Sequence, residues 1–355
     1  MTPSIPSNVA SRTTGPSAPD TSIHGTGETC LSPRVPLMSA RSLVKTFTVG
    51  RTFKPGSGRT LHAVDGISLD VFPAETLGLV GESGSGKSTL GRCLTRLYDI
   101  DGGTLSFEGS DITKADTRSL KPVRRKVQMI FQDPSASLNP RRRVRDVLAE
   151  VLKVHRIREG AGIEERLGEL MDLVGLRREY LDRYPHEFSG GQRQRIGIAR
   201  ALAVEPTLIV ADEPVSALDV SVQAQIVNLF SELREKLDLT YVFIAHDLAV
   251  VRQVSTRVAV MYLGSIVETG ETDALYARPS HPYTQALLSA IPQPHNRSRQ
   301  GRILLTGEIP SPLDPPAGCK FSTRCPQAQA VCREVRPPLT AISSERSVAC
   351  HFPLA

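Results

Sequence analysis

Residues 81–88 read Gly81-Glu-Ser-Gly-Ser-Gly-Lys-Ser88, and this stretch decides the fold class. It matches the pattern GxxxxGK[ST] of a phosphate-binding loop. A buried-strand pattern, Thr76-Leu-Gly-Leu-Val80, precedes the loop, and Thr89-Leu-Gly-Arg-Cys-Leu94 can open a helix after it. The glycines let backbone N–H groups surround phosphates, the lysine supplies positive charge, and the serine hydroxyl can bind Mg²⁺. The context predicts a nucleotide site rather than a glycine-rich turn without a ligand.

The predicted nucleotide contacts of this loop come from its glycines, its hydroxyl groups, its lysine and the start of the following helix. These residues are Gly81, Ser83, Gly84, Ser85, Gly86, Lys87, Ser88 and Thr89.

Two acidic residues stand at the end of a second strand pattern. Thr207-Leu-Ile-Val-Ala211 has the apolar character of a strand buried on both faces, and it runs into Asp212-Glu213. Ligands of open α/β folds bind at the carboxyl edge of the sheet, so we expect Asp212 to hold Mg²⁺. Glu213 is the expected general base for the attacking water. An acidic pair can also begin a helix, but the phosphate loop favours the catalytic interpretation.

Two further polar side chains follow apolar runs. His246 follows Tyr241-Val-Phe-Ile-Ala245, and Gln132 lies just beyond the strand pattern of residues 126–130. The imidazole can donate to the γ-phosphate or to water, and the amide can reach Mg²⁺ or the attacking water. The predicted catalytic residues are Lys87, Gln132, Glu213 and His246, and the predicted Mg²⁺ ligands are Ser88, Gln132 and Asp212.

Short strand patterns alternate with helical patterns, which is typical of the α/β class with a mainly parallel sheet. Apolar residues at spacings of three and four indicate helices within 144–151, 167–174 and 222–233. No strand pattern interrupts residues 140–187, so we predict a helical insertion at about 135–187 that can dock a partner. Because Gln132 leads into this insertion, it is a candidate coupling element.

The composition is that of a globular protein. The 355 residues are 40% hydrophobic and 23% charged with a net charge of +6, which excludes a wholly disordered or fibrous chain. No membrane span or secretory signal is evident, so we expect a cytosolic chain. Residues 1–37 are rich in Ser, Thr, Pro and Gly and are predicted to be a disordered tail. A nucleotide-binding domain at 38–278 and a Pro- and Cys-rich region at 279–355 follow.

A second glycine-rich motif, Phe188-Ser-Gly-Gly-Gln192, leads into a helix pattern whose start can bind an anion. The chain resembles the ATP-binding cassette superfamily, whose signature reads LSGGQ, with Phe188 in place of the leucine. The resemblance covers residues 40–355 and implies a P-loop fold with antiparallel N-terminal strands. The motifs that carry it are, in order, the phosphate loop, Gln132, residues 188–192, residues 208–213, Ser216-Ala-Leu-Asp219 and His246.

The resemblance implies a head-to-tail dimer in which each ATP lies between one phosphate loop and the partner's signature. Lys87 and Ser189 would then contact different ATP molecules, and a second cassette is required. An aromatic side chain stacks on adenine in this superfamily; Phe47 is our choice and Phe53 the alternative. The further nucleotide-binding residues implied in this way are Phe47, Gln132, Ser189, Gly190, Gly191, Gln192, Asp212 and Asp219.

Three segments look like the ATPase subunits of bacterial oligopeptide and dipeptide permeases, most closely the second ATPase of the pair; they span 131–140, 184–192 and 281–287. This implies a solute-binding protein, two transmembrane subunits and a related but different partner ATPase, with the chain peripheral at the cytoplasmic face of the inner membrane. The alternative within this resemblance is a transporter of the same architecture that imports nickel complexes, glutathione or an opine. A soluble cassette ATPase in translation or DNA repair is the alternative from another class.

The cluster Arg141-Arg-Arg143 with Arg145 has two interpretations: a nucleic-acid patch, or a solvated helix start that faces membrane subunits or lipid headgroups. No aromatic platform accompanies these arginines. We therefore favour the second interpretation and expect no nucleic-acid partner.

Four of the six cysteines cluster near the C-terminus: Cys319, Cys325, Cys332 and Cys350. Because a cytosolic compartment keeps thiols reduced, the cluster argues for metal. Four thiolates can hold one tetrahedral ion or one cubane cluster. The spacing lacks the CxxC pairs of zinc ribbons, and the permease resemblance implies a [4Fe–4S] site, which we favour over Zn²⁺. Four thiols without a metal are the third possibility.

Overall fold

The computed structural model describes residues 34–50, 58–133, 138–291 and 303–354. Residues 35–355 form one compact unit. Most of the predicted tail and Phe53 lie outside the described residues, and the predicted domain boundaries stay predictions. Within the described ranges, no helix is both long enough and apolar enough to cross a membrane.

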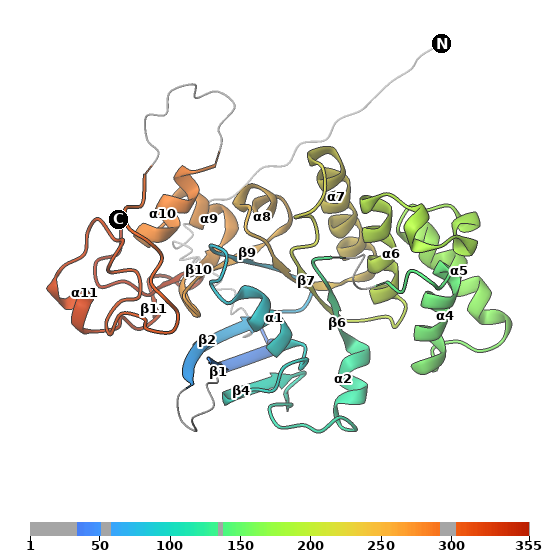
Figure 1. The fold of residues 1–355 in the computed structure, drawn as a ribbon, viewed down its shortest axis with the longest axis horizontal. Coiled ribbons are helices and arrows are strands. Elements are labelled where there is room, and N and C mark those ends of the chain that lie inside the picture. The colour runs from blue at the N-terminus through green and yellow to red at the C-terminus, as the bar shows by residue number, and fades with distance from the viewer. Residues whose placement is uncertain (1–33, 51–57, 134–137, 292–302, 355) are drawn as a thin grey trace, which may run out of the picture. The chain divides into compact units, whose positions relative to one another are not determined.

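Two sheets form the framework (Figure 1). The smaller sheet is antiparallel, with the order β2-β1-β4-β5. The larger has the order β11-β12-β10-β9-β3-β8-β7-β6, in which β9, β3, β8, β7 and β6 are parallel. The remaining pairs, at the β11 edge, are antiparallel. The predicted α/β class, with a mainly parallel core and antiparallel N-terminal strands, is confirmed.

The strands are β1 (Met38–Val49), β2 (Arg59–Val71), β3 (Thr76–Val80), β4 (Gly102–Phe107), β5 (Ser110–Asp111), β6 (Val127–Ile130), β7 (Leu208–Asp212), β8 (Thr240–Ile244), β9 (Arg257–Tyr262), β10 (Ser265–Glu271), β11 (Thr340–Ala341) and β12 (Ser347–Val348). Every residue of β3, β7 and β8 is buried. Burial on both faces explains why these strands read as continuous apolar runs.

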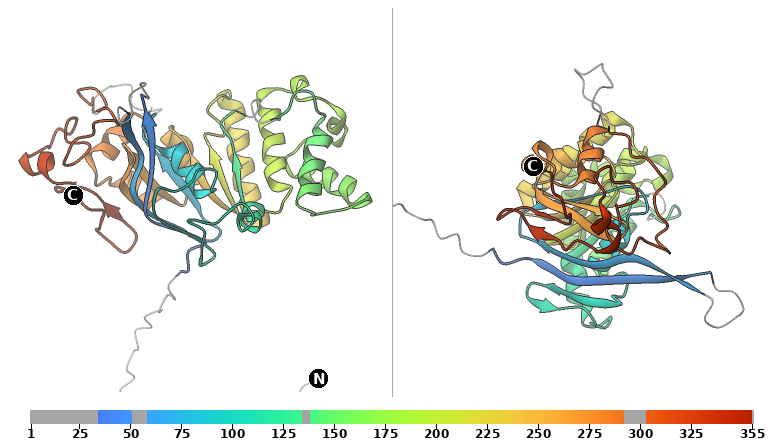
Figure 2. Two further views of the ribbon diagram at one scale, coloured as in Figure 1. Left: turned by 60° about the horizontal axis from the view of Figure 1, so that its bottom comes forward. Right: turned by 90° about the vertical axis from the view of Figure 1, so that its left-hand side faces the viewer.

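The helices are α1 (Lys87–Leu94), α2 (Leu120–Lys126), α4 (Val144–Val154), α5 (Ala161–Leu173), η1 (Arg178–Asp182), η2 (Pro185–Glu187), α6 (Gly190–Leu202), α7 (Val220–Leu237), α8 (Leu248–Val254), α9 (Thr272–Ala277), α10 (Pro282–Ser289) and α11 (Ala330–Glu334). Helices α4 and α5 with η1 and η2 form the predicted helical insertion, and residues 138–187 contain no strand. Figures 1 and 2 show the insertion beyond the β6 edge of the large sheet and the C-terminal region at the opposite edge, which β11 and β12 form.

The C-terminal region is anchored to the large sheet by one buried carboxylate and one aromatic cluster. Glu268 on β10 is fully buried and accepts hydrogen bonds from the backbone N–H groups of Ser280 and His281, at 2.7 and 2.9 Å. The rings of Tyr262, Tyr283 and Phe321 pack edge to face or tilted, with centroids 4.8–5.3 Å apart. Together these contacts bring helix α10 and the cysteine-bearing segment against the end of β9.

Candidate active site

The phosphate loop lies between β3 and α1, as predicted, and its lysine is engaged by the loop itself. The buried Lys87 ammonium donates to the carbonyls of Gly81 (2.7 Å) and Glu82 (2.9 Å) and lies 3.4 Å from Ser85 Oγ. Burial lowers the pKa of Lys87, and nearby carboxylates, those of Asp212 and Glu213 among them, partly offset this. The ammonium is thus held at the loop, where the phosphates of a nucleotide can replace the carbonyls as its partners.

Backbone packing requires two of the loop glycines. A Cβ on Gly81 would lie 2.2 Å from the carbonyl oxygen of Met261, and a Cβ on Gly86 would lie 2.1 Å from that of Ala63. Gly86 also has a left-handed φ of 100°, which favours glycine. The loop is therefore shaped by contact with neighbouring strands as well as by its own turn.

Asp212 lies at the carboxyl end of β7 and reaches the start of α1. Ser88 Oγ donates to Asp212 Oδ1 at 2.7 Å. These are two of the oxygen-bearing side chains predicted to hold Mg²⁺, and oxygen donors are what this ion prefers. Burial raises the pKa of Asp212, a shift that its bond from Ser88 and the nearby Arg92 partly offset. The donor set fits Mg²⁺, whose charge would favour the ionised carboxylate.

We expect Asp212→Asn to raise the melting temperature of the nucleotide-free chain by a few degrees at neutral pH. A carboxyl whose pKa is raised by folding destabilises the folded state once it ionises, so the free energy of unfolding falls as pH rises through that range. The gain should vanish below pH 3.8, the ordinary pKa, where the carboxyl becomes protonated in the folded and the unfolded state alike. Thermal unfolding at several pH values measures this gain in melting temperature, with Asp314→Asn, at an exposed position, as the control. An Asp212→Asn variant that is less stable than the wild type at neutral pH would contradict the prediction.

Two predicted catalytic side chains, those of Gln132 and His246, contact a third, that of Glu213. Gln132 Nε2 donates to Glu213 Oε2 at 3.0 Å, and His246 Nδ1 lies 3.5 Å from the same oxygen. The Glu213 side chain is 16% exposed and that of His246 is 56% exposed, so water can reach the group. Glu213 has a left-handed φ of 45°, a strained conformation that is typical of functional sites. The Glu213 N–H donates to the Ile244 carbonyl at 3.0 Å. The helix N-cap alternative is wrong, because the next helix, α7, begins at Val220 with Asp219 as its N-cap.

The signature motif begins helix α6. Ser189 is the N-cap, with its Oγ accepting from Gln192 N–H at 3.3 Å and its N–H donating to Gln192 Oε1 at 3.0 Å. Gly191 has a packing role that the sequence did not reveal, since a Cβ there would lie 2.4 Å from Val222 Cγ1 on α7. Among the described residues, no hydrogen bond or ion pair joins this motif to the phosphate loop, and Asp219 is exposed at the start of α7.

Phe47 lies on β1 and is partly exposed. Tyr98 packs edge-on against it with centroids 5.6 Å apart, and the Lys45 ammonium lies 5.5 Å from the ring centroid. The partly exposed ring is compatible with adenine stacking, which stays a prediction.

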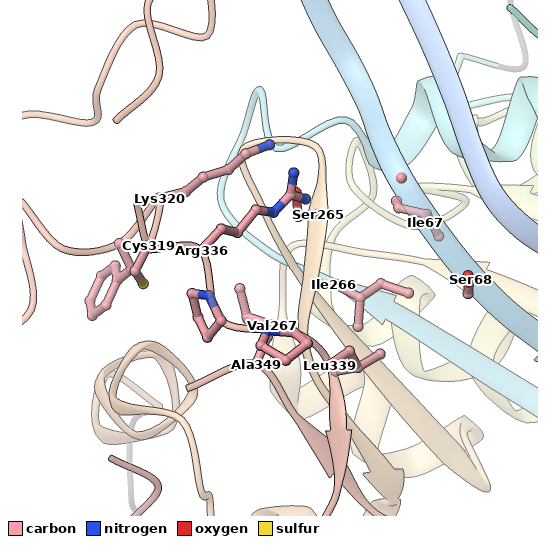
Figure 3. A pocket seen from close by; sticks show the side chains of 14 residues that line it. Ile67, Ser68, Ser265, Ile266, Val267, Cys319, Lys320, Arg336, Leu339 and Ala349 are labelled. Carbon is pink, nitrogen blue, oxygen red and sulfur yellow. The ribbon is translucent and has the colours of Figure 1, made fainter. Parts of the chain in front are cut away.

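The sequence did not predict that the C-terminal region reaches the phosphate loop. Tyr283 Oη accepts from the Glu82 N–H at 2.9 Å, and Arg324 pairs with the Glu82 carboxylate at 2.7 Å. The arginine is 242 positions away in the chain, so no local spacing could reveal the contact. Figure 3 shows a pocket that the C-terminal region forms with β2 and β10, where Lys320 and Arg336 extend toward the start of β10. Both cations pair with Asp65, at 2.7 and 2.8 Å.

The structure brings the four C-terminal cysteines to one small cavity, which their side chains line together with Phe321 and His351: Cys319, Cys325, Cys332 and Cys350. Burial raises the pKa of Cys319 to about 11 and raises those of Cys325 and Cys350. Over the described ranges, however, no three His, Cys, Asp or Glu side chains are placed closely enough to hold a metal ion. The cysteines converge, but the metal itself stays a prediction.

The basic cluster at the start of the insertion is largely paired. Arg145 contacts Asp182 (2.9 Å) and Glu164 (2.7 Å), Arg143 lies 3.7 Å from Asp182, and Arg142 pairs with Glu150. Arg143 and Arg145 thus join the start of α4 to η1 and α5 through exposed ion pairs, which contribute little stability. The interpretation of the cluster as a helix start that faces membrane subunits or lipid headgroups stays a prediction.

Two family models match the chain. The model described as ABC transporter matches residues 64–216. The model described as the C-terminal region of oligopeptide/dipeptide transporters matches residues 267–332. The first match contains the phosphate loop, Gln132, the signature and Glu213, and the second contains Tyr283, Arg324 and three of the cysteines.

Relatives match over almost their whole length. The chain is 50% identical to a putative oligopeptide transport ATP-binding protein, YkfD, of Bacillus subtilis, over 90% of this chain and 96% of that protein. It is 53% identical to a putative peptide import ATP-binding protein of Brucella abortus, over 87% of this chain and 92% of that one. A solved dimeric ATP-binding cassette, bound to ADP and phosphate, superposes with a TM-score of 0.59 at 26% identity, over 66% of this chain and 98% of that chain.

Proposed function

The chain belongs to the ATP-binding cassette transporter family, and from this membership we propose that it is the ATP-hydrolysing subunit of an importer of oligopeptides or dipeptides. The observation that carries the peptide assignment is the identity of about half over nearly the full length of relatives named for peptide import. The match to the C-terminal region of oligopeptide/dipeptide transporters supports it, because the cassette core alone would leave the cargo open.

We assign the steps at the ATP site to the residues that the fold brings together. Lys87 and the loop N–H groups bind the β- and γ-phosphates, with Phe47 at the adenine. Ser88, Asp212 and Gln132 would hold Mg²⁺, which supplies positive charge to the phosphates when bound. Glu213 takes the proton of the attacking water, and Gln132 and His246 orient the carboxylate through the contacts of 3.0 and 3.5 Å.

The signature residues act on a second cassette in this proposal. Ser189, Gly190, Gly191 and Gln192, followed by Asp219, would face the ATP held by the partner's phosphate loop. The N-terminal end of helix α6 offers N–H groups for this contact. The partner cassette is a related, different chain, and the pair sits at the cytoplasmic face of the inner membrane.

The helical insertion provides a docking surface for the transmembrane subunits. A groove on the insertion is lined mainly by residues of α4 and the positions next to it: the apolar Val147, Val151 and Val154 and the polar Arg142 and His155 are among them. Val154 is 60% exposed, so the apolar part of the groove is open to a partner. The groove follows Gln132 in the chain, so a cytoplasmic helix of a transmembrane subunit seated there would sense movement at the ATP site.

Copurification tests this function. The tagged chain, isolated in mild detergent from membranes of its native cells, should retain two multi-span proteins and a second cassette, identified by mass spectrometry. The associated solute-binding protein then decides between peptides and nickel complexes, glutathione or opines. Recovery of ribosomal proteins or nucleic acid without membrane subunits would contradict the importer and leave only the ATPase.

We propose that the four C-terminal cysteines hold a [4Fe–4S] cluster, which would cross-link the last segments of the chain. The support is that all four line one cavity. The structure describes all four and does not place any three of them closely enough to hold a metal ion, so binding of the cluster would have to draw the sulfur atoms together. Metal binding deprotonates thiols, so the raised pKa of Cys319 does not prevent it.

Anaerobic purification should therefore yield iron and acid-labile sulfide in equal amounts with visible cluster absorption. The variant Cys319→Ser should lose both, whereas Cys93→Ser, which alters the buried cysteine of α1, should keep them. Zinc in place of iron would establish the tetrahedral alternative, and no metal in the wild-type chain would reject the site.

A further inference from the structure

Glu82, the second residue of the phosphate loop, is held from three directions. Its N–H donates to Tyr283 Oη at 2.9 Å, and its carbonyl accepts from Lys87 Nζ at 2.9 Å. Its carboxylate accepts two hydrogen bonds from Arg324, at 2.7 and 3.1 Å. Two of these three partners belong to the C-terminal region, although the loop itself belongs to the cassette core.

The Arg324 contact is built for rigidity. The arginine side chain is only 7% exposed and that of Glu82 is 26% exposed, so water screens the pair weakly. A bidentate guanidinium–carboxylate pair fixes orientation as well as distance. The guanidinium also lies 6.0 Å from the ring centroid of Tyr262, which packs against Tyr283 and Phe321. Of the two C-terminal partners of Glu82, Tyr283 therefore belongs to one buried aromatic cluster and Arg324 packs against it.

The charge of Glu82 explains why such a clamp matters at a phosphate site. A carboxylate in a phosphate-binding loop repels the nucleotide and attracts the lysine that must bind it, and Glu82 already interacts electrostatically with Lys87. Arg324 neutralises this carboxylate and turns it toward the C-terminal region. Without Arg324, the carboxylate is free to turn to Lys87, with which it already interacts, and then competes with the phosphates for the ammonium.

We propose that Arg324 and Tyr283 are positioning residues of the ATP site, which hold the Glu82 carboxylate away from Lys87 and keep the phosphate loop open for nucleotide. The C-terminal region is then a part of the nucleotide site. Arg324 stands next to Cys325, so the cysteine-bearing segment and the loop are mechanically linked, but the proposal does not depend on a bound metal. It rests on the proposed nucleotide site, which the wild-type chain tests separately.

The test is the affinity of the full chain for Mg-ADP, measured by calorimetry for single and double variants. Arg324→Gln should raise the Kd about tenfold, as expected for the loss of a partly buried charged pair beside the ligand. Adding Glu82→Gln should bring the Kd back to within about threefold of wild type, because the neutral amide no longer competes for Lys87. Arg336→Gln is the matched control, since Arg336 joins the same region to Asp65 without touching the loop; its Kd should be unchanged.

Each outcome has a defined meaning. A wild-type affinity for Arg324→Gln, or a double variant that binds no better than Arg324→Gln alone, overturns the proposal. If the wild-type chain itself binds no Mg-ADP, the proposed nucleotide site is rejected, and with it the inference about Arg324 and Tyr283 that rests on that site. If thermal unfolding shows that Arg324→Gln does not fold, Tyr283→Phe is the deciding variant, because it keeps the ring and removes only the acceptor for the Glu82 N–H. We expect its Kd to be about threefold higher than that of the wild type. An unchanged Kd would overturn the proposal.

Discussion

Replacing Glu213 with Gln should lower the rate of ATP hydrolysis by about 10²- to 10⁴-fold while ATP stays bound. The carboxylate is the proposed acceptor of the proton from the attacking water, and an amide cannot take that proton. The groups that bind the phosphates are unchanged, since Lys87 is hydrogen-bonded to the loop and Ser88 to Asp212, and neither donates to Glu213. The variant is therefore expected to accumulate a closed dimer of cassettes with ATP trapped between them.

The geometry indicates that this variant keeps the native fold. Gln132 Nε2 can donate to the amide oxygen of the new side chain as it does to the Glu213 carboxylate at 3.0 Å, and the strained backbone at φ 45° is unaltered. Loss of turnover would then report chemistry rather than unfolding.

The measurement is ATP turnover by the chain copurified with its partner subunits, together with the amount of nucleotide retained after gel filtration. Glu271→Gln, which alters an exposed carboxylate at the end of β10, is the matched control and should hydrolyse ATP at the wild-type rate. Turnover near the wild-type rate in the Glu213 variant would remove this residue from the role of general base.

Replacing Gly86 with Ala should destabilise the nucleotide-free chain by about 3–5 kcal/mol and abolish nucleotide binding. The new Cβ would lie 2.1 Å from the carbonyl oxygen of Ala63, which belongs to the backbone of β2 and cannot turn aside. The residue also has a φ of 100°, which costs an alanine about 1–2 kcal/mol without any clash. Because Gly86 is the N-cap of α1, relief of the clash must move the helix that carries Lys87 and Ser88.

Gly84→Ala is the matched comparison in the same loop. Gly84 has a positive φ of 78°, but nothing lies within 4 Å of the position that an alanine Cβ would occupy there. We expect only the conformational penalty for this variant, about 1–2 kcal/mol. Urea unfolding of both variants measures the difference, and equal losses of stability would show that the contact with Ala63 is not what requires glycine at position 86.

Much of the site could be predicted from sequence because its residues follow buried strands. An apolar run that ends in a polar residue places that residue at the sheet edge, which located Asp212, Glu213 and His246 without knowledge of the topology. The order of the strands in the sheet cannot be deduced from these local patterns. In the structure β7 lies between β6 and β8, and this order brings Gln132, Glu213 and His246 into contact. The local patterns identified the residues, and the sheet order set the distances between them.

Four features could be predicted from the sequence alone: the nucleotide loop, the α/β class, the helical insertion and the clustering of four cysteines. Each of them depends on short-range periodicity or on the spacing of a few residues. The folded chain was needed to reveal that Arg324 and Tyr283 of the C-terminal region hold Glu82, and that Gly191 packs against Val222. The physical reason is range. Periodicity and turn chemistry act over a few residues, whereas ion pairs and close packing join any two positions that the folded backbone brings together.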